Sequence, residues 1–289
     1  MTEVTDPWAD RAYLRDVQYQ TDANLAARQS IYSYQQPRID LQGRVIDLAA
    51  PAPGETVCDV GCGNGTYLAE LARRGFVGRV LGVDMSLGMV AAARERLGTV
   101  GSAGRVHSAG SIESSADSAE VDSLATVGLL AADAAVLPLR DGAADLTLAM
   151  HMLYHVPDPS QALSELRRVT RPGGRVVIGL NGLGHLRQLR DVVAAARGDD
   201  VWGQHERLTL DDGETLAGRY FSSVTRHDFV SELRIPDPEP VAVYVRSMPG
   251  TQHSADPERL VAAVVARFPA APGADLTVTT HAGCLICTV

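Results

Sequence analysis

Hydrophobic and polar positions divide the chain into a helical start, an alternating middle and a less regular end. Between residues 11 and 50, apolar residues recur at the spacing of helices. From residue 55 to residue 180, short apolar runs alternate with amphipathic helical segments, which favours a parallel sheet covered by helices on both faces. The pattern therefore predicts a helical N-terminal cap at residues 1–50 and an α/β domain at residues 51–289.

Within the middle region the expected strands are separated by helices. These strands lie at residues 57–60, 79–83, 129–131, 145–150 and 175–180. Between the second and the third of them, residues 101–128 are rich in Ser, Gly and Ala, which predicts a surface insertion. The resulting prediction is a doubly wound α/β sheet that is interrupted by one insertion.

Beyond residue 181 the alternation loosens, and the remaining elements are expected from shorter patterns. Residues 206–219 are polar, which predicts an irregular or hairpin-like segment. Residues 223–235 and 276–289 are expected to be the closing strands, with a helix at residues 257–267 between them. The segment Pro236–Pro240 is expected to be a turn rather than a linker between domains.

Composition and charge narrow the classes of function. The chain has 289 residues, a formal net charge of −9 and a pI of about 5.3, which disfavours a general nucleic-acid-binding surface. No apolar stretch approaches the roughly 18 residues that span a membrane. The polar and acidic first ten residues do not resemble a signal peptide, so we expect a cytoplasmic protein.

The four cysteines are expected to be structural. Cys58 and Cys62 belong to the first strand and to the glycine-rich turn after it. Cys284 and Cys287 have the C-x-x-C spacing of zinc or redox sites, but they lie in an expected strand. Because residues three apart in a strand point to opposite faces, no metal site is expected from them.

A glycine-rich turn joins the first strand to its helix. The strand carries Asp59, and the glycines Gly61, Gly63 and Gly65 alternate after it. Glycines let a ligand lie against the backbone, and a helix N-terminus offers free N–H groups to an anion. The dinucleotide fingerprint G-x-G-x-x-G requires a glycine where this chain has Thr66, so a nicotinamide oxidoreductase is disfavoured.

Four further features follow the glycine turn in a fixed order. Asp84 ends the second strand, and Asp133 precedes a short apolar segment. The stretch from Met150 to Asp158 follows the fourth strand, and a Pro-Gly-Gly turn ends at Gly174. Together with the glycine turn, these features resemble class I S-adenosylmethionine (AdoMet) methyltransferases that act on small molecules.

The resemblance implies a fold. It implies a Rossmann-like, doubly wound and mostly parallel seven-stranded sheet, whose last strand is antiparallel. The helical cap at residues 1–50 would lie across the ligand, or pack on the sheet alone. The region at residues 181–220 would help to shape the pocket of the methyl acceptor.

The resemblance also implies the cofactor site. Asp59 would lie near the methionine end of AdoMet, while Gly61 and Gly63 let the cofactor approach the backbone. Asp84 would accept hydrogen bonds from the ribose hydroxyls, and Asp133 would face the adenine amino group. The implied cofactor-binding set is completed by Met85, Ala134 and His151.

The lid and catalytic candidates come from two other segments. Tyr19 and Arg28 resemble lid residues of the family members that methylate small molecules. Tyr19 would form a wall over the cofactor, and Arg28 would pair with the cofactor carboxylate. His151 follows the fourth strand, where it would line the methionine side or act as a general base. Tyr154 and His155 are the other catalytic candidates, and each histidine can equally be a structural residue.

The expected function is methyl transfer from AdoMet to a small acceptor, such as a secondary metabolite, by in-line displacement. One alternative is an AdoMet-binding enzyme that does not methylate, such as a cyclase. A second alternative is a non-catalytic AdoMet-binding subunit. The expected partner is a small molecule rather than a nucleic acid or a membrane, and a homo-oligomer stays open, as does the methylated atom.

Overall fold

The structure is a computed structural model of the 289-residue chain. The residues it describes are 8, 10–99, 106–108, 126–197, 208–252, 254, 256–268 and 275–289. Most of the expected insertion at residues 101–128 therefore lies outside the described residues.

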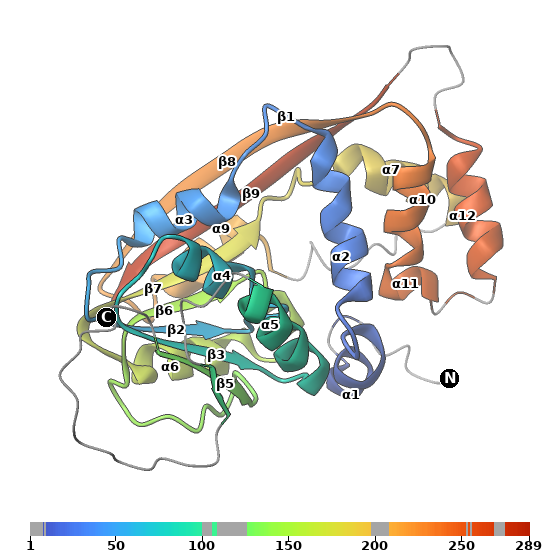
Figure 1. The fold of residues 1–289 in the computed structure, drawn as a ribbon. Helices are drawn as coiled ribbons and strands as arrows, with labels where there is room; N and C mark the ends of the chain where they lie inside the picture. Colours follow the sequence, from blue (N-terminus) through green and yellow to red (C-terminus); the bar gives the residue numbers. More distant parts are fainter. Residues whose placement is uncertain are drawn as a thin grey trace, which may run out of the picture.

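Helices occur at the start, within the alternating middle and near the end of the chain (Figure 1). The helices and helical turns are α1 (Arg11–Tyr13), η1 (Leu14–Gln18), α2 (Ala23–Ser30), η2 (Ile31–Tyr34), α3 (Leu41–Ala49), α4 (Thr66–Arg73), α5 (Leu87–Thr99), η3 (Leu153–His155), α6 (Pro159–Val169), α7 (Arg187–Arg197), α9 (Leu210–Ala217), α10 (Glu239–Arg246), α11 (Pro249–Gln252) and α12 (Pro257–Val265). Within the described part of the chain, no helix has the length and apolar character that crossing a bilayer requires.

The strands form one mixed sheet. They are β1 (Gln35–Gln36), β2 (Thr56–Val60), β3 (Arg79–Asp84), β4 (Val106–Ser108), β5 (Thr126–Ala131), β6 (Ala144–Met150), β7 (Thr170–Asn181), β8 (Ser223–Ile235) and β9 (Leu276–Thr288). Their order is β1-β8-β9-β7-β6-β2-β3-β5-β4. The strands from β7 to β4 pair in parallel, whereas β9 is antiparallel to both β7 and β8.

The mostly parallel fold with an antiparallel last strand is thus confirmed. The described sheet has nine strands rather than seven, because the short strands β1 and β4 add to its two edges. β1 has two residues and pairs with β8, so no run of alternating apolar residues marks it in the sequence. β4 lies inside the expected insertion.

Each face of the sheet has its own apolar core. One core joins α6 and α9 to β6 and β7, and the other joins α3, α4 and α5 to the opposite face. Cys287 belongs to the first core and Cys284 to the second, as the alternation of side chains along a strand requires. Both thiols are buried, and the described residues contain no His, Cys, Asp or Glu cluster suited to a metal ion.

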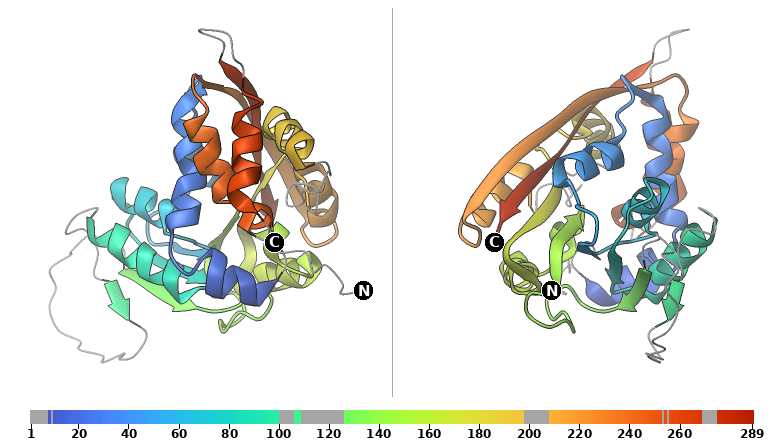
Figure 2. Two further views of the ribbon diagram at one scale, coloured as in Figure 1. Left: turned by 90° about the vertical axis from the view of Figure 1, so that its right-hand side faces the viewer. Right: turned by 60° about the vertical axis from the view of Figure 1, so that its left-hand side comes forward.

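The hairpin of β8 and β9 extends beyond the parallel strands and carries a third layer (Figures 1 and 2). Helices α10, α11 and α12 connect the two strands at the far end, and α10 packs against both α2 and α12. A third apolar core forms there, with Ile31 from the N-terminal segment packed among residues of α7, α10 and α12. The helical start of the chain therefore shares a core with the end of the chain.

Two segments beyond residue 181 differ from the expectation. Helix α9 replaces the irregular segment expected at residues 206–219, because Thr209 caps it in a reciprocal capping box with Asp212. The expected turn at Pro236–Pro240 contains the start of α10, with a proline tolerated in the first turn, where the helix needs no backbone donor. The expected helix at residues 257–267 is confirmed as α12.

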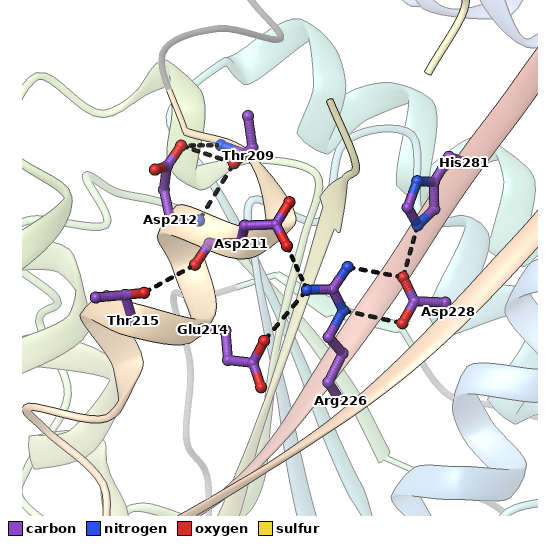
Figure 3. A network of polar contacts seen from close by, with 8 residues as sticks. All are labelled: Thr209, Asp211, Asp212, Glu214, Thr215, Arg226, Asp228 and His281. Atoms are coloured by element: carbon purple, nitrogen blue, oxygen red, sulfur yellow. Dashed lines mark hydrogen bonds and ion pairs between the residues drawn. The ribbon is translucent and has the colours of Figure 1, made fainter. Parts of the chain in front are cut away.

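A polar network fastens α9 to the hairpin (Figure 3). The Arg226 guanidinium lies 2.6 Å from Asp211, 3.2 Å from Glu214 and 2.9 Å from Asp228. Asp228 also accepts a 2.6 Å contact from His281 on β9. Arg226 therefore separates three carboxylates that would otherwise repel one another.

We expect Arg226→Met to lower the free energy of unfolding by about 1 kcal/mol, since partly exposed ion pairs contribute this much at most. The loss should shrink in high salt, because salt screens the repulsion among the remaining carboxylates. Urea unfolding at low and high salt measures it. Arg234→Met on the same strand is the control, because Arg234 has a single ion pair at 3.8 Å. Equal losses in both variants would contradict this account of the network.

Candidate active site

A cavity of about 220 Å³ lies at the carboxyl ends of β2, β3 and β6, and we call it the first cavity. Ligands of open parallel sheets bind at this edge. All ten residues expected to bind the cofactor line it: Tyr19, Arg28, Asp59, Gly61, Gly63, Asp84, Met85, Asp133, Ala134 and His151. The catalytic candidates Tyr154 and His155 line it as well. Residues that are up to 136 positions apart in the sequence, such as Tyr19 and His155, thus meet at one site.

The glycine turn has the backbone shape that the sequence predicts. Gly61 and Gly63 adopt φ angles of 71° and 53°, in the left-handed region that favours glycine. A Cβ atom on Gly61 would come within 2.6 Å of the Met152 side chain. The turn is fixed to the end of β3, because the Gly63 N–H donates to the Asp84 carboxylate at 2.9 Å. The backbone therefore stays open toward the first cavity.

Asp59 is a buried carboxylate that lacks hydrogen-bond partners. It is 1% exposed, and neither carboxylate oxygen has a partner among the described residues. Burial, with the nearby charge of Asp84, raises the pKa of Asp59 to about 7. An ionised carboxylate in this position is costly unless a cation or donor arrives to satisfy it.

Asp84 and Asp133 differ in how they are held. Asp84 accepts backbone N–H bonds from Gly63 and Ser86, while burial raises its pKa. Asp133 forms a 2.7 Å ion pair with Arg11, a residue that the sequence reasoning did not single out. Their assignment to ribose and adenine stays a prediction.

A directed chain of hydrogen bonds holds the N-terminal segment over the cavity. Arg28 Nη2 donates to Tyr19 Oη at 3.2 Å, and Tyr19 Oη lies 3.0 Å from His155 Nε2. His155 Nδ1 lies 3.2 Å from the Trp8 carbonyl oxygen, which accepts only, so this nitrogen carries a proton. In the neutral imidazole, Nε2 then accepts the Tyr19 hydroxyl hydrogen. Arg28 also donates to the Ser247 carbonyl at 2.9 Å, which ties the segment to α10.

His151 has a different environment from His155. It adopts a φ of 55°, and no described residue forms a hydrogen bond with its imidazole ring. The residue lines the first cavity, and burial lowers the pKa of its ring to about 4. The imidazole is therefore neutral at physiological pH, with a ring nitrogen available to a ligand. In contrast, both ring nitrogens of His155 are in contact with the N-terminal segment.

A second cavity of about 590 Å³ adjoins the first, between the sheet and the helical third layer. Arg28, His151 and Tyr154 line both cavities, so the two spaces meet beside these side chains. From the region expected to shape the acceptor pocket, Asn181 and His185 line the second cavity. Its other lining residues include Tyr32, Phe229 and Tyr244, which the sequence reasoning missed, and no local motif marks them.

Comparison with known proteins identifies the domain. Residues 58–178 match the family model described as a methyltransferase domain. The fold resembles that of a Bacillus halodurans protein described as a putative methyltransferase, with a TM-score of 0.58 at 15% identity over 86% of this chain and 99% of the other. Residues 58–178 therefore form a methyltransferase domain with a Rossmann-like fold, and AdoMet is the cofactor of this domain.

Curated relatives include several methyltransferases. The chain is 29% identical over 213 residues to a malonyl-[acyl-carrier protein] O-methyltransferase of Serratia marcescens, across 73% of this chain and 69% of that protein. It is 33% identical over 148 residues to the methyltransferase GfsG of Streptomyces halstedii, across 51% of this chain and 41% of that protein. Most other alignments span less than half of the relative, such as 39% of an O-methyltransferase of Penicillium expansum.

The residues of the first cavity fit AdoMet. AdoMet carries a sulfonium and an ammonium group, and the unsatisfied Asp59 carboxylate suits a positively charged donor. The left-handed Gly61 and Gly63 leave the backbone accessible to the cofactor. Asp84 would hold the ribose, and Arg28 would face the cofactor carboxylate.

Asp59→Asn should stabilise the cofactor-free protein at pH 8. The folded-state pKa of about 7 exceeds the unfolded value of about 3.9, so the native carboxyl loses stability as pH rises through this interval. We expect the wild-type Tm to fall more than that of Asp59→Asn between pH 5 and pH 8. The variant should also bind S-adenosylhomocysteine at least tenfold more weakly at pH 8.

Thermal unfolding and calorimetric titration measure the two effects. Asp22→Asn is the matched control, because Asp22 lines neither cavity and its side chain makes no cap hydrogen bond. Parallel changes in Tm for the wild type and Asp59→Asn would show that Asp59 is not the group that titrates.

Proposed function

We propose that the protein transfers the methyl group of AdoMet to a small-molecule acceptor in the second cavity. The observation that carries the proposal is the junction of the two cavities beside His151, Tyr154 and Arg28. One cavity fits the cofactor, and the other is large enough for a small metabolite. An acceptor in the second cavity would face the cofactor in the first cavity across this junction.

The protein side chains mainly hold the donor and the acceptor in position and exclude water from the site. Bound AdoMet supplies a methyl group that the positive sulfonium already activates. Asp59 and Asp84 orient the methionine and ribose parts, and the chain of contacts from Arg28 to Trp8 closes the N-terminal segment over them. Holding donor and acceptor in line accounts for much of the rate in such displacements.

His151 is the residue we assign to the acceptor proton. Its neutral imidazole lines both cavities, and its ring forms no hydrogen bond with a described residue. A hydroxyl or amine acceptor loses a proton as it is methylated, and in this proposal the unprotonated ring of His151 accepts it. Tyr154 lines the same junction, and burial raises its pKa, so it acts as a neutral hydrogen-bond donor.

Two finer expectations belong to the proposal. They are that the acceptor is a secondary metabolite and that the protein works in the cytoplasm. Both are supported by the motif resemblance and by the composition of the chain. Of the alternatives from the sequence, a cyclase-like enzyme differs from the proposal in the mass of the product, which gains no methyl group. A non-catalytic subunit differs in that it binds AdoMet or a partner without turnover.

Calorimetric titration with S-adenosylhomocysteine tests the cofactor site. We expect tight binding to the wild type and at least tenfold weaker binding to Asp84→Asn, a loss of about 1.4 kcal/mol. The substitution removes the charge and keeps one oxygen for the N–H of Gly63 or Ser86. Asp22→Asn should bind as the wild type does. Undetectable binding to all three proteins would overturn the cofactor site.

A transfer assay with methyl-labelled AdoMet and a panel of small acceptors tests the reaction. His151→Asn should lower kcat by about 10²- to 10⁴-fold, the usual contribution of a general base. Asparagine tolerates the left-handed backbone, so the variant should keep the local fold. Because His151 is also one of the ten residues expected to bind the cofactor, affinity for S-adenosylhomocysteine is measured beside kcat, and proton transfer is indicated where kcat falls much more than this affinity. A product without added methyl mass would favour the cyclase alternative, and an unchanged kcat would remove His151 from proton transfer.

A further inference from the structure

The second cavity has a charge that contrasts with the protein as a whole. The chain has 35 acidic and 26 basic residues. Three arginines, Arg28, Arg38 and Arg96, nevertheless line the second cavity, and no Asp or Glu is among its described lining residues. The first cavity is the reverse, with three aspartates facing two arginines. The two adjoining spaces therefore favour ligand groups of opposite charge.

Two of these arginines have guanidinium N–H groups that can donate hydrogen bonds to a ligand. Arg38 is exposed, and its guanidinium contacts no other described residue through a hydrogen bond or ion pair. Arg96 on α5 donates its Nε–H to the Asn64 carbonyl at 2.8 Å, and its terminal nitrogens have no described partner. Arg28, in contrast, is engaged by Tyr19 and by the Ser247 carbonyl. An anion at either Arg38 or Arg96 would add hydrogen bonds without breaking existing ones.

A buried histidine gives the second cavity another donor. The His281 N–H donates to His185 Nδ1 at 3.1 Å, so this ring nitrogen carries no proton. The proton of the neutral ring is then on Nε2, which lies 2.9 Å from the Tyr32 hydroxyl. Tyr32 Oη accepts this bond, which leaves its own hydroxyl hydrogen for a ligand. Burial raises the pKa of Tyr32, so the phenol keeps this hydrogen.

The remaining walls are neutral. Burial raises the pKa of Tyr244 to about 12 and also raises that of Tyr154, so neither phenol becomes an anion near neutral pH. Phe229 and Ile39 contribute apolar surface. The second cavity thus combines cationic and neutral donors with apolar contacts for the body of a ligand.

We propose that the methyl acceptor is an anionic small molecule whose carboxylate or phosphate group is held by the positive charge that Arg38 and Arg96 give the second cavity, with the Tyr32 hydroxyl as a further donor. This inference rests on the proposed function, because it names the class of substrate for the same site. Guanidinium groups bind carboxylates and phosphates through paired, charge-assisted hydrogen bonds. The anionic group anchors the acceptor, while the atom that is methylated faces the junction of the cavities at His151.

Calorimetric titration of the full chain, saturated with S-adenosylhomocysteine, tests the proposal with three probes of similar shape. The probes are 2-naphthoate, 2-naphthyl phosphate and the neutral 2-naphthamide. We expect at least one anion to bind tenfold or more tightly than the amide, and more weakly as salt rises. Tighter binding of the carboxylate or of the phosphate identifies which anion the second cavity prefers.

Arg38→Gln should weaken binding of the preferred anion at least fivefold and leave the amide unchanged. Arg38→Gln combined with Arg96→Gln should abolish the preference, and Tyr32→Phe should reduce it. Arg44→Gln is the matched control, because exposed Arg44 on α3 lines neither cavity. Arg96 also donates to the Asn64 carbonyl in the glycine turn. Affinity for S-adenosylhomocysteine is therefore measured for the double variant, to show whether the cofactor site is intact.

The proposal is overturned if the amide binds as tightly as both anions, if none of the probes binds, or if Arg38→Gln and Arg44→Gln behave alike. These outcomes leave the proposed methyl transfer intact, since cofactor binding and labelled transfer are measured separately. Loss of S-adenosylhomocysteine binding by the wild type would instead contradict the proposed function itself.

Discussion

The pairing of β8 with β9 is the constraint on which the rest of the structure depends. The two strands stay in register over 13 residues each, from the parallel part of the sheet to its far end. The near half pairs with β7 and completes the sheet of the methyltransferase domain. The far half carries α10, α11 and α12, and the third apolar core assembles around it. The second cavity depends on this hairpin, because Phe229, Thr280 and Ala282 of the two strands and Tyr244 of α10 line it.

The parts of the site that follow one strand each were predictable from the sequence. Asp59, Asp84 and His151 all lie at or just beyond the ends of strands whose apolar runs are clear. Since parallel strands bring their carboxyl ends to one edge, recognising the strands was enough to gather these residues. The fold class followed from the same alternation.

The parts that depend on long-range packing were not predictable. Tyr32 meets His185 across 153 positions, and Arg28 meets Ser247 across 219 positions, with no local pattern to mark either contact. Helix α9 was missed for a local reason, because the capping box of Thr209 and Asp212 was read as part of a polar segment. Two-residue strands such as β1 carry no periodicity at all.

The third apolar core also has a consequence for the order in which the chain folds during synthesis. Trp8 and Ile31 leave the ribosome before Val241, Leu260 and Val278, with which they share this core. The chain must therefore be made as far as β9 before the helices at residues 11–34 can complete the apolar core into which they pack. Until then these helices are too short to be stable alone.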